Sequence, residues 1–109
     1  MDGCYLRLYL HENTRVGGRL AWEWVLEQAN ALGIRGGSAF RAMAGFGRHR
    51  VLHEERFFEL AGSVSVELDF IVTDEEARLL LELLAREKLR VFYARVPAQF
   101  GVVDGTSRD

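Results

Sequence analysis

Hydrophobic and polar residues alternate along four separate stretches of the chain. In the stretch 4–11, leucines at every second position are separated by residues that carry polar groups, with Leu6, Leu8 and Leu10 set against Tyr5, Arg7 and Tyr9. The same two-residue period is found in the stretches 38–46, 63–72 and 90–96. A period of two is that of a strand with one buried face. We therefore predict four strands, the last of them ended by Pro97, because proline cannot continue a ladder of hydrogen bonds.

The hydrophobic period changes to that of a helix in two other segments. Apolar residues of the segment 19–32 fall on one helical stripe, and Gly33 is placed to stop the helix. A second helix is predicted to begin after Thr73, which forms a capping box with Glu76, and to end near Glu87. The apolar stripes of the two helices consist of Ala21, Val25, Ala29 and Leu32, and of Ala77, Leu80, Leu81 and Leu84.

The predicted order of elements is strand, helix, strand, strand, helix, strand. Two split βαβ units in this order give an α+β fold, a ferredoxin-like βαββαβ sandwich with a four-stranded antiparallel sheet and both helices on one face. The length of 109 residues suits a single domain, 1–109, with its core in 4–97. The polar tail 101–109 is expected to be mobile.

The helices can cover only one face of this sheet, so the other face should be open. The alternation predicts that this open face is aromatic and charged, and that it carries Tyr5, Arg7, Tyr9, Arg41, Met43, Glu67, Asp69, Tyr93 and Arg95. Such a face is either a solvated surface with ion pairs or a subunit interface, for which arginine and tyrosine are typical. The residue pattern alone leaves both interpretations open.

A glycine turn follows the second predicted strand and leads into a long connecting segment. Gly45 and Gly47 allow the backbone to approach a ligand closely, and Arg48 and Arg50 could bind phosphate. A bare Gly-x-Gly is equally typical of a structural turn. The segment 48–61 is longer than a hairpin loop needs and contains several apolar residues, so it is expected to have a function or to pack on a neighbour.

Two histidines of the 48–61 segment suggest a possible metal site. His49 and His53 are four residues apart and could share a metal on a helix, although no third ligand with firm spacing is evident.

The 14 basic and 16 acidic residues give a net charge of −2, which does not suggest a nucleic-acid partner. The single cysteine, Cys4, is expected to be a buried thiol. No secretion signal is evident, so a cytoplasmic protein is expected. Few side chains have a catalytic arrangement, so an enzyme is not expected.

The run Gly45-Phe46-Gly47-Arg48-His49 resembles the glycine turn that opens the T-loop of PII signal-transduction proteins. Residues 5–97 look more closely like a PII-like group, the domain-of-unknown-function family numbered one hundred and ninety. This second likeness rests on the stretch 37–47, which ends in Gly45-Phe46-Gly47 and has Ala42 where glycine is common.

The resemblance implies a homotrimer with its sheets turned inward and a cleft between subunits that binds AMP, ADP or ATP as an effector rather than as a tightly bound cofactor. It also suggests a membrane transporter or channel as partner. On this resemblance the subunit interface would be formed by Tyr5, Arg7, Tyr9, Arg41, Glu67, Asp69, Tyr93 and Arg95. The nucleotide site would be formed by Arg41, Gly45, Phe46, Gly47, Arg48, His49, Lys88 and Arg90.

One departure from the PII pattern concerns the phosphate site. The segment 86–92 lacks the glycine-rich loop that cradles phosphates in PII proteins, and only Lys88 and Arg90 offer charge there. A smaller ligand, such as a nucleoside monophosphate, or no ligand, therefore remains open. The leading hypothesis is a trimeric PII-like regulator that signals through the 48–61 segment. The alternative is a ferredoxin-like metal-binding trimer that uses His49 and His53, and a plain assembly module without a ligand is also open.

Overall fold

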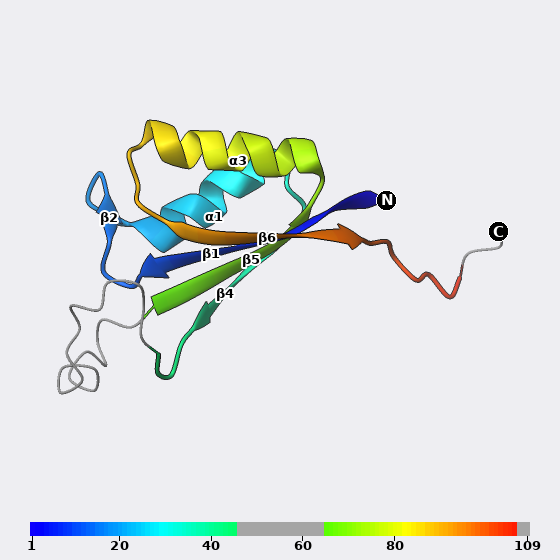
Figure 1. The fold of residues 1–109 in the computed structure, drawn as a ribbon, viewed down its shortest axis with the longest axis horizontal. Helices are drawn as coiled ribbons and strands as arrows, with labels where there is room; N and C mark the ends of the chain where they lie inside the picture. Colours follow the sequence, from blue (N-terminus) through cyan, green and yellow to red (C-terminus); the bar gives the residue numbers. More distant parts are fainter. Residues whose placement is uncertain (46–64, 107–109) are drawn as a thin grey trace.

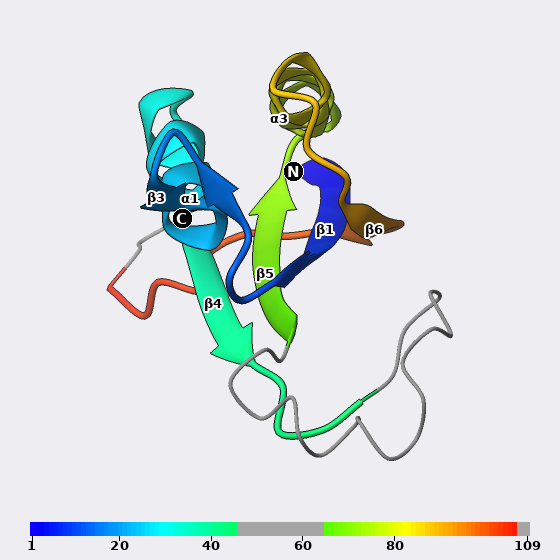
Figure 2. The same cartoon turned by 90° about the vertical axis from the view of Figure 1, so that its left-hand side faces the viewer.

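The computed structural model describes residues 1–45 and 65–106. Four strands form one antiparallel sheet in the order β4-β5-β1-β6. Both helices lie on the same side of this sheet (Figures 1 and 2). The fold is therefore the predicted α+β ferredoxin-like sandwich. Its elements are β1 (Asp2–His11), β2 (Arg15–Val16), β3 (Arg19–Leu20), α1 (Ala21–Ala31), β4 (Gly37–Arg41), β5 (Ser65–Val72), α3 (Asp74–Arg86) and β6 (Phe92–Gln99).

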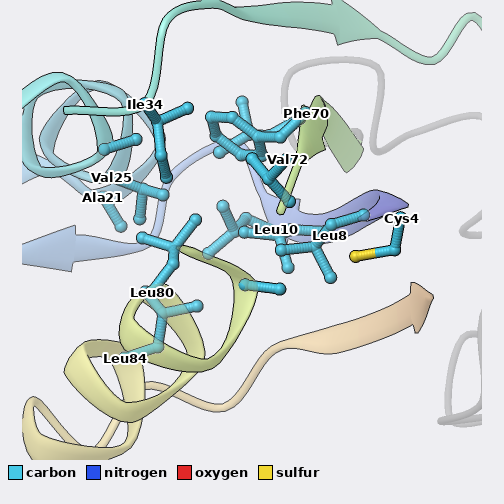
Figure 3. Close-up of a cluster of buried hydrophobic side chains, with 14 of the residues drawn as sticks. Cys4, Leu8, Leu10, Ala21, Val25, Ile34, Phe70, Val72, Leu80 and Leu84 are labelled. Carbon is cyan, nitrogen blue, oxygen red and sulfur yellow. The ribbon is translucent and has the colours of Figure 1, made fainter. Parts of the chain in front are cut away.

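The core lies between the sheet and the two helices (Figure 3). Its centre is built from the two middle strands, because every second residue of β1 and β5 points toward the helices. Leu6, Leu8 and Leu68 have no exposed surface, and Leu80 from α3 closes the layer above them. The buried thiol of Cys4 lies at one end of this layer, as expected. The full core consists of Cys4, Leu6, Leu8, Leu10, Ala21, Val25, Ala29, Ile34, Val66, Leu68, Phe70, Val72, Ala77, Leu80 and Leu84.

The predicted capping box of α3 is present. The Glu76 N–H donates to Thr73 Oγ1 at 3.1 Å, and the Thr73 N–H donates to Glu76 Oε1 at 2.9 Å. Each bond satisfies a backbone donor that the helix itself leaves unpaired. This cap fixes where α3 starts, directly after β5.

The start of α1 differs from the prediction. Arg19 and Leu20 are not helical but pair with Arg15 and Val16 in a small hairpin. Gly17 and Gly18 at its tip have φ values of 56° and 85°, which only glycine adopts without strain. The glycine pair predicted to lie in a loop therefore turns a hairpin, and the helix begins at Ala21.

Two strand ends also differ from the prediction. β4 ends at Arg41 rather than continuing to residue 46, and the chain bends away at Met43, which is almost fully exposed. β6 does not end before Pro97 but continues to Gln99, with Pro97 opposite Cys4. β6 tolerates the proline because it is an edge strand, where half of the backbone N–H groups face away from any partner strand.

Strand register places three residues on the opposite side of the sheet from the one predicted. Tyr93 and Arg95 pair with Leu8 and Leu6, whose side chains face the helices, and Arg41 pairs with the buried Val66. Residues directly opposite each other in a sheet point to the same face. Tyr93, Arg95 and Arg41 are therefore on the helix side, and their predicted place on the open face is wrong.

Candidate functional site

The open face is the side of the sheet away from the two helices. On the middle strands β1 and β5, the strand register assigns to this face the residues that were predicted there. On the edge strands β4 and β6, it assigns to this face apolar residues, which alternate along each strand with the residues on the helix side. The open face includes Tyr5, Arg7, Tyr9, Phe40, Glu67, Asp69, Ile71, Phe92 and Val96. Three of these, Phe40, Phe92 and Val96, come from the edge strands and take the places that were predicted for Arg41, Tyr93 and Arg95.

A charged cluster of four residues lies at the centre of the open face. Arg7 Nε is 3.0 Å from Glu67 Oε2 and 3.3 Å from Asp69 Oδ1, so one guanidinium faces two carboxylates. Tyr5 ties the cluster together, because its hydroxyl donates to Asp69 Oδ2 at 2.8 Å and accepts from Arg7 Nη2 at 2.7 Å. The guanidinium carbon of Arg7 is also 5.1 Å from the centre of the Tyr5 ring, within the range of a cation–π interaction.

This cluster perturbs the ionisation of its own members. Partial burial, together with the neighbouring Asp69 carboxylate, raises the pKa of Glu67, and Arg7 only partly opposes this effect. Hydrogen bonds to Tyr5 and Tyr9 raise the pKa of Arg7, which stays charged at every accessible pH. Asp69 Oδ1 is buried and makes no hydrogen bond within the described residues. The cluster therefore contains one more carboxylate than guanidinium, and the contact of Asp69 Oδ1 with Arg7 is an ion pair rather than a hydrogen bond.

Exposed apolar side chains surround the charged cluster. Phe40, Ile71, Phe92 and Val96 are each between 50% and 55% exposed, although all four are large hydrophobic residues. The rings of Tyr9 and Phe92 pack at 5.7 Å between centres, which fixes the aromatic surface between β1 and β6. Apolar groups spread over β4, β5 and β6 around polar groups are typical of a protein interface.

The predicted effector residue Arg41 lies at the end of β4 and is held by an acidic partner. Its Nη2 is 2.5 Å from Glu12 Oε2, and the Glu12 side chain is only 16% exposed. The second carboxylate oxygen of Glu12 is buried and has no hydrogen-bond partner within the described residues. Arg41 itself is 66% exposed, so its guanidinium can still be reached from solvent.

Lys88 and Arg90 are exposed residues in the connection between α3 and β6. They lie at the same end of the sheet as Arg41, because the end of β4 and the start of β6 meet the same ends of β5 and β1. They are at opposite edges, however, with β5 and β1 between them. A single subunit therefore does not bring Arg41 together with Lys88 and Arg90.

The other predicted site residues lie at the edge of the described ranges or outside them. Gly45 is the last described residue before the gap. Phe46, Gly47, Arg48, His49 and His53 lie outside the described residues. Within residues 1–45 and 65–106, no group of three or more histidine, cysteine, aspartate or glutamate side chains could hold a metal ion.

A surface hollow of about 290 Å³ lies at the other end of the sheet, lined by Gly3, Cys4, Asp74, Arg95 and Pro97. Its two charged groups neutralise each other, because Arg95 Nη2 is 3.2 Å from Asp74 Oδ1. This hydrogen bond raises the pKa of Arg95. The hollow presents no net charge to a ligand and is remote from the predicted effector residues.

Comparison with known proteins decides the family. The chain matches the family DUF190, described as an uncharacterised ACR, over residues 3–92. The protein belongs to this family. This DUF190 protein is also 28% identical to a UPF0166 protein of Aquifex aeolicus (strain VF5), over 81% of this chain and 91% of that one.

A solved structure shows the same fold as this DUF190 protein. It is the crystal structure of a protein from Thermus thermophilus described as a candidate PII-like signalling protein. The TM-score is 0.56 at 17% identity, and 89% of each chain is covered. The predicted membership of the DUF190 family is therefore confirmed, and the predicted likeness to PII-like proteins is confirmed at the level of the fold. No helix in the described ranges is long and apolar enough to cross a membrane.

Proposed function

We propose that this DUF190 protein is a PII-like regulator without catalytic activity that assembles as a homotrimer through its open face. The open face is the observation that carries the proposal. Large apolar side chains are half-exposed there around a charged cluster, and burying them against copies of the same chain would remove them from water. The PII-like fold supports an arrangement in which three sheets turn inward.

The effector site in this proposal is shared between neighbouring subunits. One edge of the sheet carries Arg41 and the other carries Lys88 and Arg90, all at the same end. In a ring of subunits, the β4 edge of one copy lies beside the β6 edge of the next, and the three cations then surround one cleft. Such a cleft suits a small anionic effector, and the family resemblance favours AMP, ADP or ATP.

Glu12 regulates access to Arg41 in this proposal. An anion that binds Arg41 must first displace the Glu12 carboxylate, which is held close and is mostly shielded from water. The built-in carboxylate thus competes with the effector for the same guanidinium. Replacement of Glu12 by glutamine removes the competing charge and keeps the shape of the side chain.

The signal to a partner protein passes through the 48–61 segment, which follows Gly45-Phe46-Gly47 directly in sequence and lies outside the described residues. A ligand can shift such a segment between two states only if it binds one of them more tightly. The resemblance to PII proteins suggests a membrane transporter or channel as the partner.

The test combines light scattering with isothermal titration of AMP, ADP, ATP and cyclic AMP. We expect a trimer mass and saturable binding of an adenine nucleotide at one site per subunit. Arg41→Ala should weaken binding about tenfold, since a charge-assisted hydrogen bond is lost. Glu12→Gln should strengthen it by up to about fivefold, the range that an exposed ion pair contributes.

Arg78→Ala is the matched control for Arg41→Ala. Arg78 is also an exposed, ion-paired arginine, but it lies on α3 and bonds to Glu75 and Glu82. Its replacement should leave nucleotide affinity unchanged. A trimer that binds none of the four nucleotides would reject the effector and keep the assembly, whereas a monomer would reject the assembly.

A further inference from the structure

The charged cluster of the open face is not neutral. Among the described residues of this face, the charged groups are Arg7 on β1 and Glu67 and Asp69 on β5. The other titratable groups of the face are the hydroxyls of Tyr5 and Tyr9 and the imidazole of His11, at the end of β1. The open-face residues of the edge strands, which are Ser38 and Phe40 on β4 and Phe92, Ala94, Val96 and Ala98 on β6, carry no charge.

Burial of this cluster against another subunit has an electrostatic cost. Both carboxylates lie against the same Arg7 Nε, so a single positive charge compensates two negative charges. In a lone subunit, water screens the excess charge, since the side chains of Arg7 and Glu67 are 37% and 26% exposed. An interface removes that water, and repetition of the same cluster in each copy brings like charges closer together.

A proton bound between Glu67 and Asp69 would remove this electrostatic cost. Protonated Glu67 becomes a hydrogen-bond donor, and the neighbouring Asp69 has a buried Oδ1 that accepts no hydrogen bond within the described residues. The proton comes from solvent, binds one Glu67 oxygen and is shared with Asp69, while the other Glu67 oxygen remains available to Arg7. The cluster then has one positive and one negative charge.

We propose that closing the open face against other copies of the chain takes up one proton per subunit, held between Glu67 and Asp69. This inference rests on the proposed assembly through the open face. It makes assembly a function of pH. The pKa of Glu67 is already raised in the lone subunit by burial and by Asp69, and the interface raises it further.

The direction of the effect follows from linkage. A group that binds its proton more tightly in the assembly than in the lone subunit strengthens association as the pH falls. Association is weakest above the pKa of Glu67 in the assembly, strengthens through the interval between the two pKa values, and is constant below the pKa in the lone subunit. Within that interval, the association constant per subunit changes by up to about tenfold for each pH unit.

Sedimentation equilibrium between pH 5 and pH 8.5 at constant ionic strength tests the proposal. The wild-type association constant should fall as the pH rises, with a slope of up to one proton per subunit. Glu67→Gln, which imitates the protonated side chain, should associate at every pH as strongly as the wild type does at low pH. Asp69→Asn removes one of the two carboxylates and should also abolish most of the pH dependence, which provides a second variant if Glu67→Gln folds poorly.

Two controls separate this effect from other titrations. His11 lies on the same face and is ionisable, so His11→Asn should retain the slope if Glu67 is the responsible group. Glu82→Gln on α3 removes an exposed carboxylate that is paired with Arg78 of the same helix, and it should also retain the slope. A wild-type assembly with no pH dependence, or an unchanged slope in Glu67→Gln, overturns the inference and leaves the trimer intact. A monomer at every pH overturns the assembly itself.

Discussion

The two middle strands and the two edge strands belong to one sheet, but they are held in place by different surroundings. Every second residue of β1 and β5 is buried against the helices, and the residues between them face the open side. By contrast, all residues of β4 are exposed, and those of β6 are exposed except for Ala98, which is partly covered. The core thus fixes the middle of the sheet, whereas the edges keep both of their faces accessible for contacts outside the subunit.

Truncation of a middle-strand residue should cause the largest loss of stability. Leu68 on β5 has no exposed surface, so Leu68→Ala removes buried methyl groups and leaves a cavity. We expect a loss of about 3–5 kcal/mol in the free energy of unfolding by urea. Val96→Ala on β6 is the matched control, and we expect a change of at most about 0.5 kcal/mol for an exposed position in the lone subunit. Similar losses for the two variants would contradict the distinction between middle and edge.

One glycine of β4 should behave as a core position although it lies on an edge strand. A Cβ atom at Gly37 would lie 2.4 Å from Phe70 Cε1 and 3.3 Å from Leu26 Cδ2. Phe70 is only 2% exposed, so its ring cannot swing into solvent. We expect Gly37→Ala to lower the free energy of unfolding by about 1–3 kcal/mol, as other overpacked sites do.

The adjacent Gly36 provides the control for this substitution. A Cβ atom there meets nothing within 4 Å. Gly36→Ala should leave stability unchanged or raise it by less than about 1 kcal/mol, because alanine restricts the unfolded chain. If the two alanine variants unfold at the same urea concentration, the contact between β4 and Phe70 is not tight.

The smallest effect on stability is expected at the ion pair between Arg95 on β6 and Asp74 on α3. Arg95 and Asp74 have side chains that are 36% and 74% exposed, so water screens their attraction. Arg95→Gln should cost less than about 1 kcal/mol in thermal or urea unfolding. Arg7→Gln in the central cluster should lower the melting temperature further, since it leaves Glu67 and Asp69 without their shared cation. An equal effect of the two variants would show that the cluster behaves as an ordinary surface ion pair.

The same contrast explains how much of the fold could be predicted from the sequence. Alternation identified the buried and open sides of β1 and β5 correctly, because one side of each is sealed by helices. The two sides of β6 are nearly alike in sequence, with Phe92 and Val96 on one and Tyr93 and Arg95 on the other, and neither is sealed. The hydrophobic pattern has no physical basis for choosing between two exposed sides, so the predicted side of Tyr93 and Arg95 is wrong.

For β4, the sequence does contain a signal that distinguishes the two sides of the strand. Gly37 lies in the same alternating row as Arg41, and a glycine in a strand often marks a position where another group approaches closely. That reasoning would have placed the row of Arg41 toward the helices and Phe40 on the open face, as observed. The ion pair between Arg41 and Glu12 had no such signal, because the two residues are 29 positions apart and meet only through the register of three strands.

The unpaired edges have a consequence for the chain before it assembles. In the part of the sheet that the structure describes, one side of β4 and one side of β6 present backbone N–H and C=O groups without a partner strand. Pro97 blocks pairing near the end of β6, but β4 contains no proline. The newly synthesised monomer is therefore the aggregation-prone species. A substitution that weakens assembly should first be noticed in cells as insoluble protein and a dependence on chaperones, before any defect in effector binding is measured.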